Sequence, residues 1–135
     1  GERYTSLQQG VVDGAENNPP SFYTSRHYEV CKYYALNEHT RVPDVLVIST
    51  VVWNKLTDEQ KRCLQVAAKK SVIEQRKLWA ASEEESLKKV QGEGVKVIYP
   101  SKEPFAAKVK DLLDSYQEQP HLYKLIQRIQ ATSVD

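Results

Sequence analysis

DEQKRCLQVAAKKSVIEQRKLWAASEEESLKKVQ, residues 58–91, contains neither glycine nor proline. Apolar residues recur along this segment at the spacing of one helix face, which predicts a single continuous α-helix. These residues are Leu64, Ala67, Ala68, Val72, Leu78, Trp79, Leu87 and Val90. Thr57 and Gln60 predict a capping box at the start of the helix, and Gly92 and Gly94 are expected to end it.

The predicted helix is too long for a small compact domain. At about 1.5 Å per residue, roughly 34 residues would span about 50 Å. A compact chain of 135 residues has a radius of gyration of only about 14 Å. The helix therefore belongs either to a coiled coil or to a body made of two parts. The segment lacks a sustained heptad of large residues, which argues against the coiled coil.

Strands and helices alternate on both sides of the long helix, which predicts an α/β fold class. The strongest strand signal is Val45–Thr50, a nearly continuous β-branched run typical of a strand buried on both faces. Further strands are expected at residues 30–36 and 95–99. Shorter helices are expected at residues 2–9, 22–28, 108–116 and 121–131.

The composition excludes several classes of protein. The net charge is +1, and basic residues are scattered among acidic ones, so we expect no nucleic-acid partner. The basic residues of the segment Lys69–Lys77 are interpreted as a solvated helix face, with contact to an anionic partner as the weaker alternative. The longest apolar run, Val45–Ile48, is too short to cross a membrane.

No set of residues in the sequence predicts catalysis. There is no GxSxG, GxGxxG or P-loop motif, and Glu83–Glu85 are interpreted as a solvated helix face. We therefore expect that the protein is not an enzyme and needs neither cofactor nor metal. Cys31 and Cys63 do not have the spacing of metal ligands. In an oxidising compartment, a disulfide between them remains an alternative.

ERYTSLQQGVVDGAEN, residues 2–17, closely resembles a signature of the solute-binding subunits of TRAP (tripartite ATP-independent periplasmic) transporters. The family pattern is roughly E-V-Y-x-A-L-Q-x-G-x-V-D-G-x-E-N, and this chain departs from it at Arg3 and Ser6. Further matches are Tyr28–Val30, Lys32, His39, Leu46–Ser49, Trp53, Leu56, Gly94–Val97 and Pro104–Phe105. The resemblance covers almost the whole chain but only the later half of a typical family member. Because the sequence begins with Gly and contains no Met, we also expect a processed or cut chain.

The resemblance implies a portion of a two-lobed, type II-like periplasmic binding protein fold, with the long helix spanning both lobes. Residues 1–42 would be a second-lobe segment that carries the ligand-site motif. Residues 43–82 would be a first-lobe segment with the hinge crossing and the first part of the long helix. Residues 83–135 would be the C-terminal segment of the second lobe.

The resemblance also implies a ligand site. Asn17 stands where the family places an Asn near the ligand carboxylate, and Glu16 and Ser21 would flank the same wall of the cleft. His39 stands where some sialic-acid-binding members have a cleft histidine. Structural alternatives are that Asn17 caps a helix, that Glu16 is a surface carboxylate and that His39 lies in a surface loop. The Arg that clamps the carboxylate in the family lies upstream of the segment matched here.

The function implied is that of a periplasmic subunit that captures a small organic acid by lobe closure and delivers it to membrane permease subunits. The expected partners also include the N-terminal half of the same protein. The Asn, Ser and Tyr residues around Asn17 favour a sugar acid such as a uronate, with a C4-dicarboxylate or another organic acid as the rival. Two other hypotheses are an interaction domain that uses the long helix and, less favoured, a small α/β enzyme.

Overall fold

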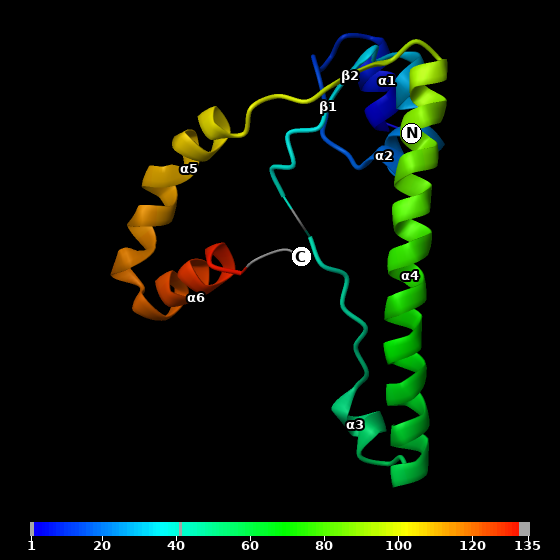
Figure 1. Cartoon of the computed structure of the whole chain (residues 1–135), viewed down its shortest axis with the longest axis vertical. Helices are drawn as coiled ribbons and strands as arrows, with labels where there is room; N and C mark the ends of the chain where they lie inside the picture. The colour runs from blue at the N-terminus through cyan, green and yellow to red at the C-terminus, as the bar shows by residue number, and fades with distance from the viewer. Residues whose placement is uncertain (1, 41, 133–135) are drawn as a thin grey trace. The chain divides into compact units, whose positions relative to one another are not determined.

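The computed structural model describes residues 2–40 and 42–132. The elements are α1 (Glu2–Gln8), α2 (Pro19–Thr24), η1 (His27–Glu29), β1 (Tyr33–Ala35), α3 (Thr50–Trp53), α4 (Asp58–Gly92), β2 (Lys96–Ile98), α5 (Glu103–Ser115), η2 (Tyr116–Glu118) and α6 (Pro120–Gln130) (Figure 1). They form two compact units, one of Gly1–Leu36 with Val42–Ile98 and one of Asn37–Arg41 with Tyr99–Asp135.

Helix α4 confirms the long helix predicted from the sequence. It contains 35 residues in one piece, which corresponds to a length of about 52 Å. The predicted capping box is present, because the Gln60 amide donates to Thr57 Oγ1 at 3.2 Å and the Thr57 amide donates to Gln60 Oε1 at 2.9 Å. Gly94 follows the helix with a φ of +85°, a left-handed conformation that glycine adopts at little cost.

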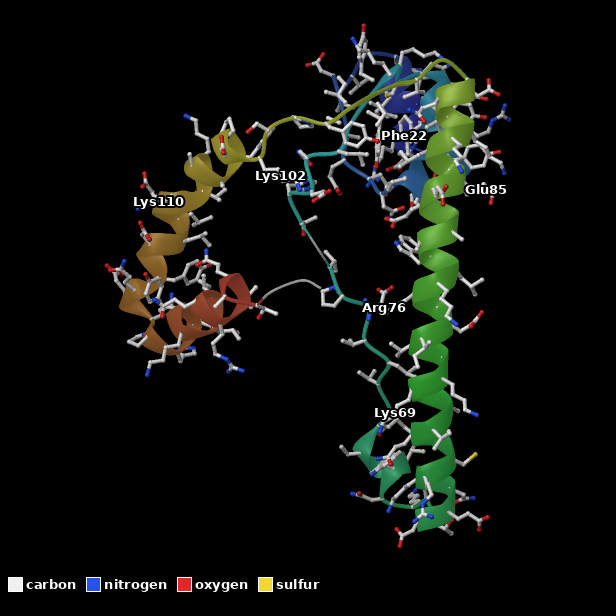
Figure 2. The ribbon with its side chains drawn as sticks, in the orientation of Figure 1. Phe22, Lys69, Arg76, Glu85, Lys102 and Lys110 are labelled. Atoms are coloured by element: carbon white, nitrogen blue, oxygen red, sulfur yellow. The ribbon has the colours of Figure 1, made fainter. Side chains whose placement is uncertain are left out.

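A small core lies where the last turns of α4 meet the segments that surround it. Phe22 of α2, Val90 of α4 and Val95 are buried together, and Tyr34 of β1 packs against them. Figure 2 labels Phe22 beside the C-terminal part of α4. Strand β1 pairs in parallel with β2, with Tyr34 opposite Val97. Burial of these side chains holds α2 and the small sheet against α4.

The rest of α4 is far more exposed. Residues 69–81 are all exposed, including the labelled Lys69 and Arg76 of Figure 2. Burial of the helix begins again at Ser82 and Glu83 and is complete at Ser86 and Val90. Apolar side chains in the exposed part, among them Ile73 and Leu78, are therefore in contact with water.

The prediction of a buried strand at Val45–Thr50 is wrong for this structure. Residues 42–49 belong to no helix or strand, and Thr50 begins α3. Val45, Leu46 and Val47 are 76–80% exposed. A strand needs a neighbouring strand to pair its backbone N–H and C=O groups. The two strands that the structure describes pair with each other and leave none for this segment.

Other predicted elements are present with different bounds. The helix expected at 22–28 begins at Pro19 and ends at Thr24, because Arg26 adopts a left-handed φ of 58° that interrupts it. The helix expected at 108–116 begins already at Glu103, since Pro104 fits its first turn. The strands at 30–36 and 95–99 are limited to three residues each. Cys31 and Cys63 are free thiols, so the disulfide left open by the sequence is not formed.

The second unit contains α5, η2 and α6. Helices α5 and α6 pack against each other, and Leu113, Leu122 and Ile126 are partly buried. Lys102 and Glu38 form an ion pair within this unit, and Lys110 Nζ lies 2.6 Å from Asp114 Oδ2. Among the residues described here and in the first unit, no helix is both long and apolar enough to pass through a membrane.

Candidate functional site

The turn that leads into α2 and the first turn of that helix carry three of the four predicted site residues. Its first hydrogen bond runs from the Asn18 amide to the side-chain oxygen of Asn17, at 3.0 Å. Asn18 Oδ1 then accepts from the Ser21 amide at 2.9 Å, and Asn18 O accepts from the Phe22 amide at 2.9 Å. The turn is thereby joined to the first turn of α2.

The helix cap is Asn18, whose extended backbone and side-chain acceptor are those of an N-cap residue. Pro19 and Pro20 follow in the first turn, where a missing N–H is no loss. The alternative that Asn17 serves only as the helix cap is therefore wrong. The Asn17 side chain accepts one hydrogen bond through Oδ1, and its Nδ2 carries two donors suited to a carboxylate or hydroxyl oxygen.

The backbone of Asn17 is held by a side chain from the sheet. The Tyr34 hydroxyl donates to the Asn17 carbonyl oxygen at 2.6 Å. The Tyr34 ring stacks on Phe22 with 4.6 Å between ring centroids. Strand β1 and helix α2 thus fix the turn from two sides, although 17 residues separate Asn17 and Tyr34 in the sequence.

Two carboxylates act on the Tyr34 hydroxyl. The pKa of Tyr34 is raised to about 12, chiefly because burial penalises the phenolate and then because Glu83 and Glu16 repel it. Glu16 comes from the turn and Glu83 from α4. The surroundings of Asn17 therefore carry negative charge and acceptor oxygens.

Glu16, Asn17 and Ser21 lie together at the start of α2, where Glu16 is exposed and the other two are half-buried. His39 belongs to the second unit, and its Nδ1 lies 2.7 Å from Asn37 Oδ1. The structure thus brings together three of the predicted residues and describes His39 within a separate unit.

Two residues that sequence reasoning did not assign to the site contribute to this geometry. The amino-acid sequence gave no reason to assign Tyr34 to the site in preference to Tyr33, or to expect Glu83 near Asn17. In the structure Tyr33 is 69% exposed, whereas Tyr34 points toward Phe22. The alternation of side chains along a strand could have suggested that only one of the two tyrosines faces the core.

Other surfaces of the described chain are weaker candidates for a metal or ligand site. No group of three or more His, Cys, Asp or Glu residues within 2–40 and 42–132 is arranged to hold a metal ion. A shallow hollow lies on one face of α4, and its lining residues are Glu59, Arg62, Cys63, Val66, Ala67 and Lys70. Its walls come from one helix and carry charges of both signs, so it does not enclose a ligand.

Comparison with known proteins identifies the family. The family described as bacterial extracellular solute-binding protein, family 7, matches residues 1–119. A TRAP periplasmic solute-binding protein from Xanthobacter autotrophicus, solved with bound β-D-galacturonate, is 44% identical and has a TM-score of 0.84, covering 98% of this chain and 44% of its own. One from Chromohalobacter salexigens, solved with bound D-glucuronate, is 40% identical with a TM-score of 0.88, covering 96% of this chain and 44% of its own.

The sialic acid-binding periplasmic protein SiaP of Vibrio cholerae is 35% identical over 127 residues, which are 92% of this chain and 40% of SiaP. The chain therefore spans 40–44% of the length of these relatives. The structural matches confirm the predicted fold class, a portion of the α/β fold of periplasmic binding proteins. With the family match over 1–119, they show that the chain belongs to the bacterial extracellular solute-binding proteins of family 7, whose solved relatives are TRAP periplasmic solute-binding proteins.

Proposed function

We propose that this chain is part of a periplasmic solute-binding subunit of a TRAP transporter, which captures a sugar acid such as a uronate between two lobes. Closure of the lobes excludes water from the acid, and the closed form delivers it to the membrane permease subunits. The subunit binds and releases its ligand without making or breaking a covalent bond. The observation that carries the proposal is the fixed Asn17 turn in a chain of this family.

The ligands of the relatives support a sugar acid. Solved proteins at 44% and 40% identity contain galacturonate and glucuronate, and SiaP is a sialic acid-binding protein. All three ligands combine one carboxylate with several hydroxyl groups. A site for such a ligand needs hydrogen-bond donors for the carboxylate and acceptors for the hydroxyl protons.

The charges near Asn17 also favour a sugar acid over a C4-dicarboxylate. Glu16 and Glu83 both raise the pKa of Tyr34, so both act on the space around the Asn17 turn. Their oxygens can accept hydrogen bonds from sugar hydroxyl groups, and they repel a doubly charged dicarboxylate more strongly than a singly charged sugar acid. The ligand carboxylate would be paired by a cationic side chain outside this chain, in the part of the protein to which the family assigns its clamping Arg.

The burial of α4 supports the proposed assignment of segments to lobes. The part of α4 after Ser82 packs against α2, whereas residues 69–81 are exposed together with apolar Val45–Ile48. In the proposal, 1–42 and 83–135 form second-lobe segments, and the apolar surface of 43–82 is covered by first-lobe residues that this chain does not contain. Removal of that apolar surface from water would stabilise the complete subunit.

The test is calorimetric titration of the complete protein, in which the preceding part of the chain supplies the other lobe. D-glucuronate, D-galacturonate, sialic acid and succinate serve as ligands. We expect at least one sugar acid to bind more tightly than succinate. Asn17→Ala is expected to weaken that binding by about tenfold or more, because a hydrogen bond to a charged group is worth about 1.5–3 kcal/mol.

Asn54→Ala is the matched control, because Asn54 is an exposed asparagine at the C-cap of α3 and its backbone N–H donates within that helix, not to the turn. It should bind the sugar acid like the wild type. Binding of succinate alone would contradict the proposed ligand class. Unchanged affinity in Asn17→Ala would contradict the proposed site while leaving the family membership intact.

A further inference from the structure

Tyr34 connects two parts of the chain that do not adjoin in sequence. Its backbone belongs to β1, where it pairs with Val97 of β2. Its hydroxyl reaches the carbonyl oxygen of Asn17 at 2.6 Å. A hydrogen bond of this length and the pairing of the strand fix the position of the Asn17 backbone relative to the sheet.

The Tyr34 ring is itself held in place. It stacks on the buried Phe22 ring with an interplanar angle of 26° and packs at the edge of the Phe22, Val90 and Val95 core. An aromatic ring so packed has few alternative positions, so the hydroxyl is presented to Asn17 without the entropy loss of ordering a free side chain. Phe22 lies only five positions after Asn17, so the same contact joins both ends of the turn to β1.

We propose that Tyr34 is a positioning residue for ligand binding, which acts by holding the Asn17 turn in its binding conformation rather than by touching the ligand. The inference rests on the proposed function, since it requires that Asn17 contacts the ligand. A turn that samples its binding conformation for only a fraction of the time lowers the apparent affinity by that fraction. The Tyr34 hydrogen bond keeps this fraction high before the ligand arrives.

The hydroxyl remains a donor throughout the neutral range. Burial, Glu83 and Glu16 raise the pKa of Tyr34 to about 12, so the phenolate is not formed at physiological pH. Tyr34 therefore keeps the proton that it donates to the Asn17 carbonyl.

The experiment uses Tyr34→Phe, which keeps the ring and removes the hydroxyl. Tyr33→Phe is the matched control, because Tyr33 is the neighbouring residue of the same strand and is 69% exposed. In the complete protein, titrated with the sugar acid that the wild type binds, Tyr34→Phe should raise Kd by about threefold to tenfold, as expected for one neutral hydrogen bond. Tyr33→Phe should leave Kd unchanged.

A double-mutant cycle with Asn17→Ala separates positioning from a general structural effect. If Tyr34 acts through Asn17, Tyr34→Phe should change Kd much less when Asn17 is already Ala. The same fold-change in both backgrounds would overturn the inference, and so would an unchanged Kd in Tyr34→Phe alone. In either case binding by the wild type would still support the proposed function, whereas a wild type that binds no acid would refute the proposed function itself.

Amide hydrogen exchange of the ligand-free protein gives an independent measurement. The Asn18 and Ser21 amides donate to side-chain oxygens of the turn, at 3.0 and 2.9 Å. Tyr34→Phe should make both amides exchange faster, because the turn opens more often. Equal exchange rates in wild type, Tyr34→Phe and Tyr33→Phe would show that the hydroxyl does not hold the turn, and would overturn the inference.

Discussion

The substitution Phe22→Ala tests whether the small core organises the first unit. Phe22 is 5% exposed, stacks on Tyr34 and lies beside Val90 and Val95. A buried phenylalanine side chain removes about 150–250 Å² from water, which at about 25 cal/mol per Å² stabilises the folded state by about 4–6 kcal/mol as an upper bound. Core replacements of this type cost about 3–5 kcal/mol in practice. We expect Phe22→Ala to lower the free energy of unfolding of the unit by at least about 3 kcal/mol.

Urea unfolding followed by near-ultraviolet circular dichroism measures this change, because Tyr23, Tyr28 and Tyr34 pack around the core. The core cluster that the structure describes in this unit consists of only Phe22, Val90 and Val95, so the variant is expected to lose a cooperative transition or to shift it to low urea. Phe105→Ala is the control, since Phe105 is 48% exposed in the other unit. A change below about 1 kcal/mol in Phe22→Ala would refute the assignment of this core.

Three further predictions concern the helix cap, histidine and the thiols. Thr57→Ala should destabilise the start of α4 by about 1 kcal/mol, which far-ultraviolet circular dichroism would detect as a lower melting temperature. An unchanged melting curve would show that the capping box contributes nothing to the stability of the helix. Burial, with a smaller contribution from Arg3, lowers the pKa of His27 in the folded state. The free energy of unfolding should therefore be highest above about pH 6.5 and fall as the pH drops through the lowered pKa. Urea titrations at several pH values should show a weaker decline in His27→Gln. Cys63 is exposed, whereas burial raises the pKa of Cys31, so an aromatic disulfide reagent should modify Cys63 first and Cys63→Ser should leave only the slow reaction.

The long helix could be predicted because its determinants are local. Helical spacing, the Thr57–Gln60 capping box and the glycine that follows the helix all act within a few residues along the chain. Local sequence alone could not show that Val45–Thr50 forms no strand in this structure. The β-branched composition of this segment favours a strand, but strand formation depends on a partner that the described part of the chain does not provide.

The candidate site was only partly predictable. The family signature indicated Asn17, and helix capping was its structural alternative, a role that the structure assigns to Asn18. The contact between Tyr34 and Asn17 depends on which side of β1 faces α2, and a strand of three residues gives too short a pattern to decide this. The role of His39 and the division into lobes stay predictions.

The exposed apolar segment Val45–Ile48 has a consequence for the chain when it is produced alone. It belongs to no helix or strand, is uncharged and rich in β-branched residues, and has neither glycine nor proline. Such segments recruit copies of themselves into intermolecular sheets, because their backbones pair edge to edge. The separate 135-residue polypeptide is therefore expected to form thioflavin-positive aggregates at high concentration, and replacement of Val47 by lysine should delay them.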